Sequence, residues 1–292
     1  MNFSSPTHRL LFSSVPVGFS GALRVYIAFL LAGIAPHLLS CIAAGLVIYA
    51  TYTLDRCLPG AEDAINQRNL GGADQHTAIV TCGLAFSCGL GLFIWEGLFV
   101  VPFIPLIIGF LYTKGVTFGS FSLKLKGSAG GKNAVIGLTW GSSIAFVVSH
   151  WTTNSLTTVC IFVFYSLKLF TNSILYDLKD LKGDWAAGIR TIPLYLGERR
   201  TKHLLASLSF LLHAGMLVFV LIGLIRPELV ILGYSFLIGG PFILLYTTDL
   251  EARATGIQKH LREIAIDGES ALALGLRFLT GLVPGAIVPQ CG

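Results

Sequence analysis

Charged residues are scarce in this chain of 292 residues. Asp, Glu, Lys and Arg together make up 12% of the positions, whereas hydrophobic residues make up 54%. A soluble domain carries roughly 25% charged residues, so this chain has too few of them to cover itself with a solvated surface. The shortage excludes an ordinary soluble protein and favours one that lies in lipid.

The cysteines lack the spacing of disulfide-rich and zinc-binding proteins. The chain has six cysteines, and none of them belongs to a Cys-x-x-Cys pair. Most lie within or beside apolar stretches, where a thiol behaves as a small apolar side chain. We therefore expect neither a disulfide framework nor a zinc site.

Long apolar runs recur along the whole chain. A helix needs about 20 predominantly apolar residues to cross the hydrocarbon core of a bilayer, and the sequence predicts about nine such segments. They are Pro16–Gly33, His37–Leu54, Thr77–Ile94, Leu98–Thr113, Ala134–Trp151, Leu156–Tyr176, Leu204–Ile225, Leu229–Thr247 and Ala271–Val288. The predicted fold class is an all-α, multi-pass integral membrane protein.

The basic residues predict the orientation of the chain. Most of them lie in the loops after the second, fourth, sixth and eighth segments, and the other loops hold only Arg226. Basic loops stay in the cytoplasm, so we expect the N-terminus inside and the C-terminus outside. The acidic residues gather on the same face, with only Glu96 and Glu228 left for the other one. The tendency of basic loops to stay in the cytoplasm does not account for acidic residues. A metal site is therefore the first explanation to test for the acidic residues on this face.

The stronger acidic cluster follows the sixth segment. Asp177, Asp180 and Asp184 are separated by three and four residues, a spacing that places them on one face of a helix. Carboxylates gathered on one face repel one another, and oxygen ligands suit Mg²⁺, which completes its shell with water and substrate phosphate. We predict a Mg²⁺ site here. The alternative is a solvated face neutralised by Lys179 and Lys182.

The motif at this cluster resembles a known family. Asp177-x-x-Asp180-x-x-x-Asp184, followed by Gly-Ile-Arg-Thr-Ile-Pro at 188–193, is similar to the second aspartate-rich motif of the UbiA superfamily of intramembrane prenyltransferases. The resemblance implies nine transmembrane helices, built as two four-helix bundles and a final helix, with aspartate motifs after helices two and six. It implies one domain over 1–292, with halves at about 16–113 and 134–247 and a final helix at 271–288.

The acidic cluster after the second segment departs from the family. The usual form of its first motif is Asn-Asp-x-x-Asp-x-x-x-Asp, often with a later Asn. Asp55 is similar to the central Asp, and Asp63 with Asn66 resembles the end of the motif. Thr51 and Tyr52 stand where the leading Asn and Asp would be, so one carboxylate is missing.

The spacer within this first motif is also longer than the family's. Pro59 and Gly60 interrupt the helix there, and Glu62 is the candidate to substitute for the missing carboxylate. We predict Asp55, Glu62 and Asp63 as metal ligands, with Asp55 and Asp63 catalytic together with Asp177, Asp180 and Asp184. The alternative for the first cluster is an ordinary polar loop.

The resemblance also implies residues that contact a diphosphate. The stretch Ser122-Leu123-Lys124 and Asn133 is similar to a family segment that approaches the diphosphate, and Arg190 and Asn66 lie within the two motifs. Lys and Arg bind anionic oxygens. The predicted diphosphate-binding residues are therefore Lys124, Asn133, Arg190 and Asn66. Basic residues that merely orient the chain are the alternative.

Three functions remain open. The first is a Mg²⁺-dependent prenyltransferase on the cytoplasmic face that ionises an allylic prenyl diphosphate and passes the prenyl group to an aromatic or lipid-alcohol acceptor. The second is a terpene cyclase of the same superfamily, which needs no acceptor. The third is a transporter, for which only Arg24, Lys168 and Arg277 are charged residues deep in the predicted segments. The expected partners are a prenyl diphosphate and the bilayer, with no nucleic acid.

Overall fold

The computed structural model describes residues 5–57, 72–114, 116–118, 121–123, 130–186, 188, 190–242 and 266–281. Within these ranges the chain is almost entirely helical. The helices are α1 Pro6–Ser13, α2 Val15–Leu31, α3 Leu38–Cys57, α5 Gln75–Trp95, α6 Phe103–Lys114, α7 Gly131–Ser149, α8 Ser155–Ala186, α9 Ile192–Leu196, α10 Glu198–Leu221, α11 Leu229–Leu237, the π-helix η2 Ile238–Phe242 and α15 Glu269–Gly281.

Each predicted segment overlaps a helix of the structure. The largest difference is α8, which runs past the predicted end at Tyr176 to Ala186. Among the described residues, five stretches are long and apolar enough to cross a membrane: Pro6–Leu31, Leu38–Cys57, Gln75–Trp95, Ser155–Leu178 and Glu198–Leu221. The protein is therefore an integral membrane protein, and the count of nine spans stays a prediction.

A short β-hairpin that the sequence did not predict lies after α6, within a fold that is otherwise all-α as expected in the described residues. After α6, strand β1 (Val116–Phe118) pairs antiparallel with strand β2 (Phe121–Leu123), and Thr117 lies opposite Ser122. The two strands are rich in β-branched and aromatic residues, which favour extended backbone. The helical prediction is otherwise confirmed for the part of the chain that the structure describes.

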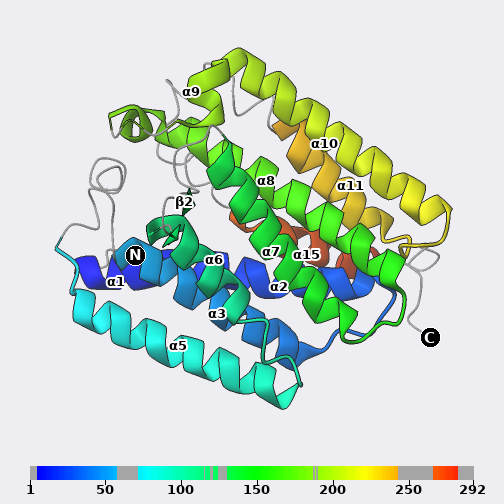
Figure 1. Ribbon diagram of the computed structural model, residues 1–292. Helices are drawn as coiled ribbons and strands as arrows, with labels where there is room; N and C mark the ends of the chain where they lie inside the picture. The colour runs from blue at the N-terminus through cyan, green and yellow to red at the C-terminus, as the bar shows by residue number, and fades with distance from the viewer. Residues whose placement is uncertain are drawn as a thin grey trace.

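The helices form a bundle in which α5 and α10 lie at opposite edges, with α2, α7 and α8 between them (Figure 1). Helix α3 packs between α2 and α5, while α8 packs between α7 and α10. Helix α15 contacts α2 and α11. Large apolar side chains on the edge helices are exposed, such as Leu84 on α5 and Phe210 on α10. Such surfaces suit contact with lipid.

Two glycines bring α7 and α8 into close contact. A Cβ added at Gly137 would lie 2.5 Å from the backbone oxygen of Ser166, and one at Gly141 would lie 2.7 Å from the Ser166 nitrogen. Glycines four residues apart allow helices in a membrane to approach at this distance. Gly130 precedes α7 with a φ of +83°, a conformation that glycine adopts without strain. The first turn of α7 therefore lies against the part of α8 that carries the second aspartate motif.

Candidate functional site

Asp177 is the centre of the site that the structure describes. Its side chain is fully buried on α8 and faces the first turn of α7. Its Oδ1 accepts a hydrogen bond from Lys132 Nζ at 3.1 Å, and its Oδ2 accepts one from Asn133 Nδ2 at 2.7 Å. Asn133 Nδ2 also donates to Ser173 Oγ at 3.0 Å. Charge-assisted bonds and the positive end of the α7 dipole both stabilise an anion at this position.

Lys132 is a site residue that the sequence prediction missed. It pairs directly with Asp177, whereas the prediction selected Lys124 and Asn133. A lysine in a cytoplasmic loop looks the same in sequence whether it orients the chain or lines a site. The sequence feature that could have identified Lys132 is its position: it lies next to Asn133, after two glycines, at the start of an apolar segment.

The other members of the second cluster lie along the same helix, as predicted. Asp184 is buried about two turns beyond Asp177 on α8. Asp180 lies between them on α8, but its side chain is outside the described residues. Arg190 is exposed, and the described residues offer it no hydrogen bond or ion pair. The structure thus brings Asn133 to Asp177.

The first cluster is described only in part. Asp55 lies exposed in the last turn of α3. Its neighbour Arg56 donates from Nη1 to Ser13 Oγ at 3.1 Å and to Ser14 Oγ at 2.7 Å, which ties α3 to the junction of α1 and α2. Four further predicted residues lie outside the described part of the chain: Glu62, Asp63, Asn66 and Lys124. Their roles stay predictions.

Aromatic and acidic side chains connect the two clusters. Tyr176, next to Asp177, donates from its hydroxyl to Asp267 Oδ1 at 2.7 Å. Tyr52, about one turn before Asp55 on α3, stacks on Trp140 of α7, the helix that packs against α8. The exits of α3 and α8 therefore face a common region. Asp267 was not predicted, because it precedes the last apolar segment without a recognisable motif.

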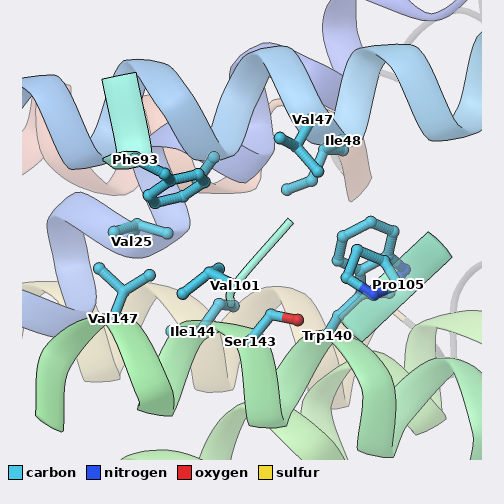
Figure 2. A pocket seen from close by; sticks show the side chains of 11 residues that line it. Val25, Val47, Ile48, Phe93, Val101, Pro105, Trp140, Ser143, Ile144 and Val147 are labelled. Atoms are coloured by element: carbon cyan, nitrogen blue, oxygen red, sulfur yellow. The ribbon is translucent and has the colours of Figure 1, made fainter. Parts of the chain in front are cut away.

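An apolar pocket lies deeper in the bundle (Figure 2). Its lining includes Val25, Ala44, Ile48, Phe93, Trp140 and Ile144. The one hydroxyl in the lining, on Ser143, donates to Thr139 O at 2.8 Å. Trp140 follows Asn133 by about two turns of α7, and it stacks on Tyr52 with ring centroids 6.0 Å apart. The pocket therefore lies about two turns of α7 deeper than Asn133, and its lining is almost entirely apolar.

The donor set at Asp177 fits Mg²⁺. Among the described residues, no group of three or more His, Cys, Asp and Glu side chains is arranged to hold a metal. However, Asn133 Oδ1 is buried beside Asp177 and has no hydrogen-bond partner there. A buried carboxylate next to an unused amide oxygen offers oxygen ligands only, as Mg²⁺ requires. Structural zinc sites instead use mainly Cys and His.

Comparison with curated proteins finds partial relatives. Digeranylgeranylglyceryl phosphate synthases from two strains of Halobacterium salinarum are each 29% identical to this chain over 100 residues. The match covers 34% of this chain and 35% of each relative. The chain thus spans about a third of the length of the curated relatives it matches.

Solved structures show the same fold over nearly the whole chain. A UbiA homolog from Archaeoglobus fulgidus bound to GPP and Mg²⁺ has a TM-score of 0.62 at 18% identity, over 94% of this chain and 99% of that one. The same homolog bound to DMAPP and Mg²⁺ has a TM-score of 0.61 at 17% identity, over 94% and 98%.

The sequence, and not only the fold, assigns this chain to a family. The model of the UbiA prenyltransferase family matches residues 74–261, a region that contains Asn133, Asp177 and Asp184. The match covers more than half of the chain and confirms the resemblance carried by the second aspartate motif. On this evidence, the chain belongs to the UbiA prenyltransferase family.

Proposed function

We propose that this protein is a Mg²⁺-dependent prenyltransferase that ionises an allylic prenyl diphosphate and transfers the prenyl group to an aromatic or lipid-alcohol acceptor. The observation that carries the proposal is the buried Asp177, held by Lys132 and Asn133, with an apolar pocket deeper in the same bundle. A polar site beside an apolar pocket matches the two ends of a prenyl diphosphate. The Mg²⁺ and prenyl diphosphates bound to the Archaeoglobus fulgidus homolog support the same chemistry.

The proposed residue roles follow the donor chemistry. The proposed metal ligands are Asp55, Glu62, Asp63, Asp177, Asp180 and Asp184. The proposed diphosphate contacts are Lys124, Asn133, Arg190 and Asn66, to which we add Lys132. Bound Mg²⁺ would stabilise the negative charge that develops on the leaving diphosphate. Lys132 and the first turn of α7 would add fixed positive charge on the same side.

The reaction breaks one bond and forms another at the same carbon. The bond between C1 and the diphosphate oxygen breaks, and its electron pair leaves with the diphosphate. The acceptor then donates an electron pair to C1 and loses a proton. Apolar residues such as Val25 and Ile48 would exclude water from the allylic cation in the meantime. We place this chemistry on the cytoplasmic face, in a single domain that spans 1–292.

Removal of the metal is the first test. Purified protein incubated with geranyl diphosphate, Mg²⁺ and a lipid extract that supplies the acceptor should release inorganic diphosphate, and a chelator should reduce the release to background. Excess Mg²⁺ should restore it. Release that continues at the same rate in the chelator would contradict the proposed metal dependence.

The pocket should set the length of the prenyl chain. Ala44 lines it roughly 16 Å along α3 from Asp55, so Ala44→Phe should obstruct a long chain before a short one. We expect kcat/KM to fall at least about tenfold more for a C20 than for a C10 diphosphate, an effect of the size that overfilled apolar sites show. Leu84→Phe, at an exposed position on α5, is the matched control. Equal losses of kcat/KM for the C10 and C20 diphosphates would show that the prenyl chain binds outside this pocket.

A cyclase of the same superfamily is the second candidate. The observation that favours it is an aromatic pair in which Tyr52, at the position of a family carboxylate, stacks on the pocket residue Trp140. Aromatic faces stabilise cations, and a cyclase must hold a cation longer than a transferase. Such an enzyme would convert the prenyl diphosphate alone into a cyclic product.

A further inference from the structure

Two exposed aromatic side chains lie at the end of the bundle that carries the second aspartate motif. Trp185, in the last turn of α8, is 76% exposed, and Tyr195, on the short helix α9, is 79% exposed. Helix α9 contacts both α8 and α10, so the two aromatics belong to the same end of the bundle (Figure 1). Trp and Tyr are enriched at the level of the lipid headgroups, because each has an apolar ring and a polar tip. The proposed mechanism uses neither of them.

Two arginines follow these aromatics, in the first turn of α10. Arg199 and Arg200 are both exposed, and in the part of the chain that the structure describes neither guanidinium makes an ion pair or a hydrogen bond. The acidic residue beside them, Glu198, is already paired with Lys202 at 2.6 Å. Since that pair is neutral as a whole, the two guanidinium groups give this surface a net positive charge.

The exposed face of α10 runs from these arginines along the apolar part of the helix. Phe210, Leu217 and Leu221 are large apolar side chains of α10 that are exposed, as lipid-facing side chains are. Positions 199, 203, 210, 217 and 221 are separated by four or seven residues, a spacing that places them on one face of a helix. The face that meets lipid in the middle of the span therefore ends in Arg199 and the exposed His203.

The length of α10 places the arginines at the depth of the lipid phosphates. The helix has 24 residues and is therefore about 36 Å long, whereas the hydrocarbon core of a bilayer is about 30 Å thick. The excess corresponds to about one turn. All the Glu, Lys and Arg residues of α10 lie within Glu198–Lys202, so this is the turn that extends beyond the hydrocarbon. The arginines thus lie beside headgroups, at the end of a lipid-facing strip.

We propose that Trp185, Tyr195, Arg199 and Arg200 form a binding surface for the headgroups of anionic phospholipids. A guanidinium donates two parallel hydrogen bonds to a phosphate, and the aromatic rings lie at the same depth as the lipid glycerol and carbonyl groups. Because the charge of the surface is positive, it favours a lipid with a net negative charge over a zwitterionic lipid with the same phosphate. The inference does not depend on the proposed transferase function.

Quenching of Trp185 fluorescence by a bound lipid tests the inference. The full-length protein in neutral detergent is titrated with phosphatidylglycerol that carries brominated acyl chains, and separately with phosphatidylcholine of the same chains. The difference from Trp185→Phe isolates the signal of this tryptophan. We expect phosphatidylglycerol to bind more tightly. Arg199→Gln combined with Arg200→Gln should weaken its binding about thirtyfold, about fivefold for each arginine, which is the usual attraction of one basic residue to anionic lipid. Lysine at both positions should retain most of the affinity.

Glu198→Gln combined with Lys202→Gln is the matched control, because it changes the same turn of α10 and leaves the net charge as it is. Its affinity for phosphatidylglycerol should equal that of the wild type, which would show that the turn tolerates substitution. Equal quenching of the wild type by the two lipids would overturn the inference, and so would wild-type affinity in the double arginine-to-glutamine variant. Displacement of the brominated lipid by millimolar inorganic phosphate would overturn it too, because the arginines would then bind a free anion in place of a lipid.

Discussion

Replacing Asp177 with asparagine should reduce prenyl diphosphate turnover by at least about a hundredfold, as the loss of one preorganised electrostatic contact in an active site typically does. The side chain keeps its size but loses its negative charge. Lys132 then loses its ion pair with Asp177, and the site loses a carboxylate that Mg²⁺ prefers as a ligand. Diphosphate release with geranyl diphosphate, saturating Mg²⁺ and a lipid extract as the source of the acceptor measures the effect.

Asp74→Asn is the matched control for this loss. Asp74 caps the start of α5, where it accepts hydrogen bonds from His76 N at 3.1 Å and from Thr77 Oγ1 at 2.5 Å. The bond from Thr77 holds the pKa of this carboxyl below its usual value. Asparagine is an equally good cap, so activity should stay at the wild-type rate. Activity of Asp177→Asn equal to that of the control would show that Asp177 has no role in the reaction.

Replacing Lys168 with methionine should destabilise the protein by about 3–5 kcal/mol, the usual effect of removing one partner of a buried ion pair. Lys168 Nζ lies 2.6 Å from Glu269 Oε1, and each side chain is only 11% exposed. The same ammonium donates to Ser235 Oγ at 2.7 Å, so it ties α8 to both α11 and α15. Without it, Glu269 would remain as a buried charge. Denaturant unfolding in detergent measures the change in the free energy of unfolding.

Two further variants identify the cause of that loss. Lys202 and Glu198 are also 2.6 Å apart, but Glu198 is exposed and Lys202 is only half-buried on α10, so Lys202→Met should cost less than about 1 kcal/mol. Replacing Lys168 and Glu269 together with apolar residues should recover much of the stability, because no unpaired charge remains. Equal losses for Lys168→Met and Lys202→Met would mean that the buried pair does not hold these helices together.

The helices were predictable because each apolar run is long and the period of the pattern is clear. The ends of the helices were harder to predict. The prediction ended the sixth segment at Tyr176, where apolar residues give way to charged ones, yet α8 continues to Ala186. Hydrogen bonding along the helix continues into the aqueous side, whatever the polarity of the residues. The hairpin after α6 was missed because the prediction considered only membrane segments.

The site was predictable where a motif marks it and not elsewhere. Asp177 and Asn133 are far apart in the sequence, yet both were selected, and the structure places them 2.7 Å apart. Lys132 and Asp267 carry no motif, and only their hydrogen bonds to Asp177 and Tyr176 on α8 reveal them.

Product analysis of the purified protein tests the central claim most directly. The protein is incubated with C10, C15 and C20 prenyl diphosphates and Mg²⁺, with and without a lipid extract, and the products are identified by mass. The proposed function predicts a prenylated acceptor that forms only with the extract, together with one diphosphate released for each transfer. A cyclic hydrocarbon or terpene alcohol formed from the diphosphate alone would contradict the transferase. Prenyl diphosphates that stay intact in every mixture would contradict the proposed chemistry altogether.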